Sequence, residues 1–243
     1  IILFFTFSSF SIPQEKTSPK DWSHRALKED YFAKERVRVI RLAEEYANLE
    51  PVTVTAESSP RSAGGIHDFY SEGDYWWPDP DNPEGPYIQR DGLTNPDNFT
   101  AHREAMIRFS QISGALASAY LVSKDDKYVE ALAPHLRAWF IDESTKMNPN
   151  LLYGQAIKGR VTGRGIGIID TIQLMEVAKA IQAVEGSGVI SPAEIQQMTE
   201  LDGFEQQPTL AHQRHDDRAA HEVVTRERQA AYHRELALAQ RVV

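Results

Sequence analysis

Residues 99–141 carry the clearest structural pattern of this sequence and read FTAHREAMIRFSQISGALASAYLVSKDDKYVEALAPHLRAWFI. Its apolar residues recur every three or four positions, as they do along the buried face of an α-helix. The polar turn at 123–126 divides the stretch into a helix that starts near Pro96 and ends near Val122 and a second helix over 127–141. Pro134 lies inside the second pattern and should kink that helix or mark its boundary.

Helical patterns also flank this stretch. They cover residues 21–48, residues 168–184 and a segment that opens with Ser191 as N-cap and Glu194 at the third helical position. Only residues 51–55, PVTVT, read as a short extended segment. Consecutive helices with short turns predict an all-α protein. Antiparallel helical hairpins with long loops gathered at one end predict an (α/α) toroid, incomplete in this chain.

The loop over residues 62–103 is rich in Gly, Pro and aromatic residues. Six aromatic residues fall between Phe69 and Tyr87, whereas disordered linkers are poor in Trp and Tyr. Flat aromatic rings stack on sugar faces, and nearby polar groups orient hydroxyls and carboxylates. The composition of this loop therefore predicts a binding surface.

A second loop carries a local excess of positive charge. Residues 144–169 contain no Asp or Glu but contain Lys146, Lys158, Arg160 and Arg164, in a chain whose net charge is -9. A solvated charged face is the ordinary explanation, and an anion-binding site is the one that we favour, because nearby glycines let backbone approach a ligand. The acidic net charge argues against nucleic acid as a general partner.

The sequence predicts no metal or cofactor. It contains no cysteine, no zinc motif among its histidines and no calcium loop among its carboxylates. His102 falls in the first turn of a predicted helix, where it either packs or faces a cleft as an acid, base or carboxylate ligand. Both interpretations stay open.

The two ends differ from the body of the chain. Residues 1–20 begin IILFFTFSSF, which favours the remnant of a secretory signal peptide and a periplasmic or secreted protein, with no membrane contact after its removal. Residues 201–243 hold no lysine and four of the eight histidines. This composition fits either a frame-shifted tail or a natural polar helix. We therefore divide the chain into residues 1–20, 21–200 and 201–243.

Several long blocks resemble the alginate lyase-like family of polysaccharide lyases. They are SAGGIHDFYSEGDYWWPDP (62–80), GPYIQRDGLTNPDNFTAHR (85–103), WFID with TKMNPNLLYGQAIKG (139–159) and GRGIGIIDT (163–171), within a resemblance over about residues 35–198. The resemblance implies an (α/α) toroid, export, and β-elimination on a uronic-acid polymer such as alginate or glucuronan. In that reaction the substrate carboxylate is neutralised, a base removes the C5 proton and an acid protonates the departing oxygen.

The resemblance and the two loops together assign substrate-binding roles but no catalytic residue. The expected carboxylate ligands are Arg90, Asn98, His102, Gln155, Arg160 and Arg164. The expected stacking rings are Trp76, Trp77 and Tyr153, and Tyr70 and Tyr75 fall in what looks like the family's mobile lid loop.

One departure from the family pattern concerns catalysis. Members carry an Asn-His pair and a later Tyr with Arg, but this chain has no Asn after Met198. We therefore expect a truncated lyase with weak or no activity. The alternatives are a non-catalytic uronan-binding protein, a glycosidase acting on unsaturated uronides and a purely structural helical fragment. The sequence leaves the particular uronan, the cleavage mode and the oligomeric state undetermined.

Overall fold

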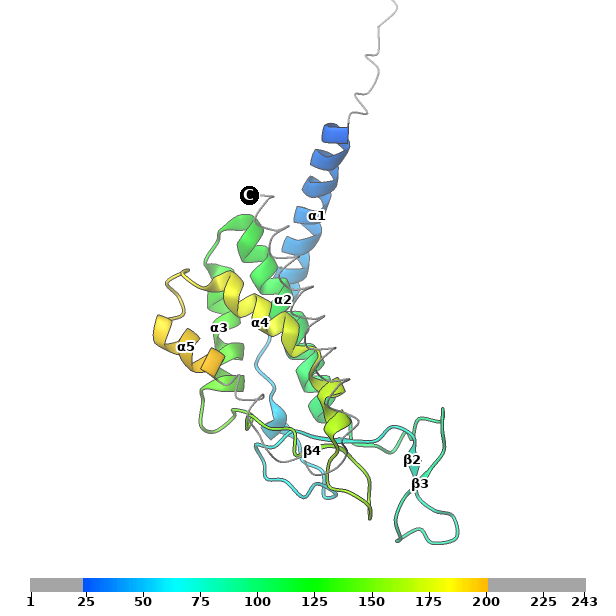
Figure 1. Cartoon of the computed structure of the whole chain (residues 1–243). Coiled ribbons are helices and arrows are strands. Elements are labelled where there is room, and N and C mark those ends of the chain that lie inside the picture. The colour runs from blue at the N-terminus through cyan, green and yellow to red at the C-terminus, as the bar shows by residue number, and fades with distance from the viewer. Residues whose placement is uncertain (1–23, 201–243) are drawn as a thin grey trace, which may run out of the picture.

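The computed structural model describes residues 24–200, and helices dominate this part of the chain (Figure 1). The five α-helices of this part are α1 (His24–Tyr46), α2 (Ala101–Ser123), α3 (Lys127–Phe140), α4 (Leu174–Val184) and α5 (Pro192–Glu200), with short 3-10 helices η1 (Val54–Ala56) and η2 (Gly165–Thr171). Among these described residues, no helix combines the length and apolar character needed to cross a bilayer.

Helix α2 lies at the centre of the helical body, where it packs against α1, α3 and α4. The apolar face predicted for residues 99–122 is the buried one. It includes Ile112 and Leu116, and the Phe109 ring stacks on Trp139 of α3 at a centroid distance of 4.8 Å. The expected pair of helices around a polar turn is therefore confirmed.

Helix α2 starts later than predicted, at Ala101 rather than near Pro96. Side chains take the backbone N–H groups of the preceding residues: Asn95 accepts from Asp97 N at 3.0 Å, and Glu72 accepts from Phe99 N at 2.7 Å. Asn and Asp side chains commonly form such local turns, which compete with helical hydrogen bonds.

Pro134 lies inside α3, which continues to Phe140, so it marks no boundary. The buried side chains on both sides of it, Leu132 and Leu136, hold the helix against the core despite the missing backbone donor.

The other predictions of secondary structure had mixed outcomes. Helix α5 begins as predicted, because Ser191 N donates to Glu194 Oε2 at 2.9 Å while Glu194 N donates to Ser191 Oγ at 3.3 Å. The helix predicted over 168–184 is instead η2 followed by α4. Residues 51–55 are not a strand but lead into η1, which Thr53 caps.

Four short strands lie in the two long loops. Strand β1 (Tyr70–Glu72) pairs in parallel with β4 (Tyr153–Ala156), with Tyr70 opposite Tyr153. Strand β2 (Trp76–Trp77) pairs antiparallel with β3 (Ile88–Gln89). Figure 1 shows both loops at the same end of the helices, where the β2–β3 hairpin projects away from the helical body. The parallel pairing joins segments about eighty residues apart, so it brings the aromatic loop and the basic loop together.

Candidate functional site: an aromatic and arginine cluster

The site is built where the two loops meet at Gly73, directly after β1. A Cβ atom at this position would lie 2.7 Å from Trp76 Cδ1 and 2.8 Å from Arg164 Nη2. The tryptophan of the aromatic loop and the arginine of the basic loop therefore converge on one glycine. Only glycine leaves room for both side chains. The aromatic loop and the basic loop recognised in the sequence therefore form one surface.

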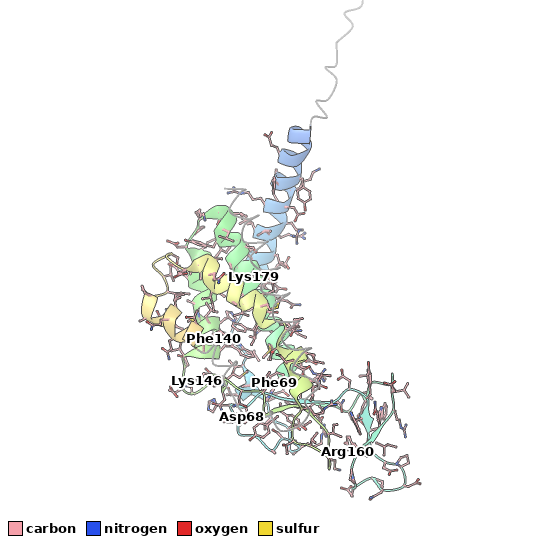
Figure 2. All side chains as sticks on the ribbon, in the orientation of Figure 1. Asp68, Phe69, Phe140, Lys146, Arg160 and Lys179 are labelled. Atoms are coloured by element: carbon pink, nitrogen blue, oxygen red, sulfur yellow. The ribbon has the colours of Figure 1, made fainter. Side chains whose placement is uncertain are left out.

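Cations of both loops lie over the rings of the hairpin. The Arg160 guanidinium carbon is 5.1 Å from the centroid of Trp76, and that of Arg90 is 5.3 Å from Trp77. The Nε–H of Arg160 also donates to Tyr87 O at 2.6 Å, which ties the basic loop to the hairpin. Figure 2 shows Arg160 at this end of the molecule. We define Trp76, Trp77, Arg90, Arg160 and Arg164 as the aromatic–arginine cluster.

The arginines of this cluster differ from two neighbouring arginines, Arg61 and Arg103, which are neutralised by carboxylates. Arg61 pairs with Glu72 at 2.6 Å, and Arg103 pairs with Asp74 at 2.7 Å. Within residues 24–200, no carboxylate lies within ion-pairing distance of Arg90, Arg160 or Arg164. The cluster thus presents positive charge that the described carboxylates leave unneutralised.

Arg164 is held by Gln155 rather than by a carboxylate. Its Nε donates to Gln155 O at 2.7 Å, and its Nη2 lies 3.1 Å from Gln155 Oε1. Burial lowers the pKa of Arg164, although the charge of the nearby Asp170 acts in the opposite direction. An arginine remains protonated at neutral pH after such a shift.

Gln155, which we expected to bind substrate, is itself buried. Its Nε2 lies 3.2 and 3.1 Å from the two carboxylate oxygens of Asp170, and its backbone N donates to Ser71 Oγ at 2.7 Å. Ser71 Oγ in turn donates to Asp170. The described contacts give Gln155 a supporting position behind Arg164.

Tyr70 is buried as well, although it was expected in a mobile lid. Its hydroxyl donates to Glu72 Oε1 at 3.0 Å, and burial raises its pKa, with further contributions from the Glu72 charge and hydrogen bond. The structure therefore does not place Tyr70 on a surface open to a substrate. A ring that packs in the interior and a ring that faces a ligand look alike in the sequence, so only the described contacts reveal that Tyr70 is packed.

Of the two interpretations left open for His102, packing in the interior or facing a cleft, the structure shows the first. Its Nδ1 accepts from Tyr70 N at 2.9 Å, so its Nε2 is the protonated nitrogen and donates to Glu57 O at 2.9 Å. Burial lowers its pKa, and the hydrogen bond to the Glu57 carbonyl only partly opposes this, so the ring is neutral at pH 7. Because both ring nitrogens are occupied, His102 is not placed to bind a carboxylate.

The remaining predicted residues lie around the cluster. Tyr75 is 42% exposed and its carbonyl accepts from Arg90 N at 2.8 Å, so it stays next to the hairpin arginine. Asn98 donates through Nδ2 to Gly73 O at 3.2 Å. Tyr153 is half-buried, and its ring lies against Gly64 so closely that a Cβ there would come within 2.5 Å.

A shallow depression of about 420 Å³ lies beside Asn98 at the start of α2. Its lining includes Glu57, Asp97 and Glu104, and also Arg61, whose charge is already paired with Glu72. This depression is acidic overall and does not coincide with the cluster, so it is unsuited to a polyanion. Within residues 24–200, no group of three or more His, Asp or Glu side chains could hold a metal ion.

Sequence reasoning missed the two buried carboxylates that support the site. Glu72 accepts from Arg61, Tyr70 and Phe99 N, and Asp170 accepts from Ser71 and Gln155. One signal for Asp170 was available, because it is the first acidic residue after the acid-free run that ends at Ile169. Glu72 offered none, since an isolated Glu in a polar loop is normally exposed.

The fold and the site define a helix-rich protein that gathers tryptophan and arginine side chains at its loop end. The alginate lyase family model matches residues 53–221, well over half of the sequence. The chain therefore belongs to the alginate lyase family. The family resemblance is confirmed, and the match runs over residues 53–221 where the sequence blocks indicated about 35–198. Residues 201–221 lie outside the described part of the chain.

A solved structure supports the same assignment. The crystal structure of an alginate lyase from Bacteroides ovatus is 33% identical, with a TM-score of 0.67 over 77% of this chain and 52% of that one. The chain thus spans about half the length of that protein. Comparison with curated proteins gave no match.

Proposed function

We propose that this protein binds a uronic-acid polymer such as alginate or glucuronan through the aromatic–arginine cluster, as a polysaccharide lyase by descent. The observation that carries the proposal is the meeting of Trp76 and Arg164 at Gly73, with Arg160 5.1 Å above the same ring. A tryptophan face suits the apolar face of a sugar, and unpaired guanidinium groups suit its carboxylate. Each repeating uronate offers both features.

The lyase reaction gives such a site a chemical purpose. Removal of the C5 proton places negative charge next to the uronate carboxylate, so cations on that carboxylate lower the barrier. Arg160 and Arg164 are the residues of this chain that we assign to that neutralisation. Substrate binding is better supported than turnover, because hydrogen bonds occupy both ring nitrogens of His102 and leave neither free to take a proton from the substrate.

We further propose that the chain has weak or no lyase activity. No histidine in the sequence follows an asparagine, so the Asn-His pair that the family resemblance implies is absent. The helical hairpin α2–α3 and its neighbour α4 fit part of an (α/α) toroid, in line with coverage of 52% of the relative's chain. The apolar segment at residues 1–10 supports export to the periplasm or outside.

Binding and turnover can be measured separately with the full chain. We expect titration with alginate oligosaccharides to show binding that weakens with added salt, because exposed charges are screened, and a neutral glucan to show none. Trp76→Ala and Arg160→Gln should each weaken binding about tenfold. Arg38→Gln, which removes an exposed arginine of α1, is the matched control and should change nothing.

Lyase turnover is followed by the ultraviolet absorbance of unsaturated uronate products. We expect binding with little or no growth of this absorbance, which also describes the non-catalytic alternative. Sustained product formation would overturn the weak-activity proposal but not the binding site. Equal binding by wild type and Trp76→Ala would overturn the site itself.

A further inference from the structure

The buried carboxylate of Asp170 lies behind the aromatic–arginine cluster, where four elements meet. It is on η2, it accepts from Ser71 of β1 and Gln155 of β4, and Arg103 Nε of α2 lies 4.0 Å away. The side chain of Asp170 is only 4% exposed. Burying a carboxylate costs free energy through lost hydration, so the groups that hydrogen-bond to Asp170 must compensate for that cost.

The carboxylate determines which way the Gln155 amide points. An ionised carboxylate only accepts hydrogen bonds, so the amide group that faces Asp170 must be Nε2, the donor. The opposite end is then Oε1, and it lies 3.1 Å from Arg164 Nη2. Turning the amide over would set oxygen against carboxylate and N–H against guanidinium, which is unfavourable at both ends.

The backbone of Gln155 is held by the same group. Its N–H donates to Ser71 Oγ, whose own proton goes to Asp170, and its φ of 56° lies in the left-handed region that non-glycine residues seldom adopt. The carbonyl of this strained residue accepts from Arg164 Nε at 2.7 Å. Both acceptors that orient Arg164 therefore depend on contacts that lead back to Asp170.

We propose that Asp170 is a positioning residue for carboxylate recognition: through Ser71 and Gln155 it aims the Arg164 guanidinium at the surface beside Trp76. The part of this inference that concerns uronate rests on the proposed function. Asp170 does not touch the ligand surface, and its contribution passes through Arg164. A change at Asp170 should therefore matter only while Arg164 is present.

The test uses Asp170→Asn in the full chain, because this variant keeps the shape but offers one acceptor and one donor. Either Ser71 or Gln155 then loses its acceptor, or the Gln155 amide turns over and presents N–H groups to Arg164. We expect an alginate tetrasaccharide to bind about tenfold more weakly. In an Arg164→Gln background, Asp170→Asn should cause no further loss. A loss of equal size in both backgrounds would indicate a general structural role and overturn the proposal.

A second measurement needs no ligand. In nitrogen-15 labelled protein, exchange of the Arg164 Nε–H with water should be slow in wild type and about tenfold faster in Asp170→Asn, since its acceptor is no longer held in place. The signal is assigned by its absence in Arg164→Gln. Asp74→Asn, which removes a different carboxylate next to Arg103, is the matched control and should leave this exchange unchanged.

The two readouts separate the two claims. Failure of wild type to bind the tetrasaccharide would refute the proposed function, while the exchange rates would still decide whether Asp170 positions Arg164. Exchange within twofold of wild type in Asp170→Asn would overturn the positioning role. If Asp170→Asn does not fold, Ser71→Ala breaks the same chain of contacts one step later, because it removes the hydroxyl that joins Asp170 to Gln155 N. It should produce the same faster exchange, and unchanged exchange there would also overturn the positioning role.

Discussion

Glu72→Gln should be among the most destabilising conservative substitutions in the loop end of this protein. The Glu72 side chain is 5% exposed and accepts from Arg61 twice at 2.6 Å, from Phe99 N at 2.7 Å and from the Tyr70 hydroxyl at 3.0 Å. The amide of Gln keeps one acceptor and turns a donor toward these donors. Removing one partner of a buried ion pair costs about 3–5 kcal/mol. Arg61 remains 32% exposed, so we expect water to recover part of that cost, leaving about 2–3 kcal/mol.

The stability that Glu72 contributes should depend on pH. Burial by itself would raise the pKa of Glu72, but hydrogen bonds from Arg61, Phe99 N and Tyr70 outweigh it and hold the pKa below the usual 4.5. A carboxyl whose pKa is lower in the folded state contributes stability above its unfolded pKa and loses it as pH falls through the folded value. Wild type should therefore exceed Glu72→Gln in stability at neutral pH, and the difference should shrink below about pH 4.5.

Thermal unfolding followed by circular dichroism measures the effect. A loss of about 2–3 kcal/mol in a domain of this size lowers the melting temperature by roughly 5–10 °C. Glu104→Gln is the matched control, because this glutamate is exposed and, within residues 24–200, accepts a hydrogen bond from the Thr100 hydroxyl alone, at 2.6 Å. The assignment of Glu72 as a buried, charged hydrogen-bond acceptor is wrong in either of two cases. In the first, Glu72→Gln and Glu104→Gln have the same melting temperature. In the second, the difference in stability between wild type and Glu72→Gln does not depend on pH.

Two further predictions concern the glycine at the cluster and the start of α5. Gly73→Ala should weaken alginate binding about tenfold, because the added Cβ displaces Trp76 or Arg164. Gly92→Ala is the comparison: its Cβ meets open space, but its φ of 74° strains the hairpin without touching the cluster. Equal affinity in Gly73→Ala and wild type would contradict the close approach at Gly73. Glu194→Gln should lower the free energy of unfolding in urea by about 1 kcal/mol, because it weakens the hydrogen bond from Arg137 and the helix-capping contacts. These contacts lower the pKa of Glu194 to about 2, so their contribution to stability is lost as pH falls from about 4.5 toward 2. An unfolding midpoint independent of pH in that interval would argue against it.

The local elements of this protein follow from short-range patterns. The helix over 127–140 was predicted to within one residue, because the apolar spacing of Tyr128, Leu132 and Leu136 and the polar turn before it are contiguous in the chain. The cap of α5 was predicted for the same reason. The start of α2 was misplaced partly because one of the two side chains that compete for its backbone N–H groups is Glu72, which is distant in the sequence.

The site residues also divide into those that local sequence patterns predict and those whose roles depend on contacts distant in the sequence. Trp76, Trp77 and the basic residues Arg160 and Arg164 were picked out from composition, and the structure brings the two groups together. The roles of Tyr70, His102 and Gln155 were not readable from composition, because burial depends on neighbours that the fold supplies. Asp170 illustrates the point, since its partners come from β1 and β4.

Short-range patterns are enough to predict a helical protein with an aromatic loop and a basic loop, because periodicity, capping and charge act over a few residues. The meeting of the two loops at Gly73 and the hydrogen bonds from Arg164 to Gln155 emerge only from the folded chain. Those outcomes depend on the parallel pairing of β1 with β4, which joins Tyr70 to Tyr153. Such pairing is selected by the packing of the whole domain, and no local pattern in either segment encodes it.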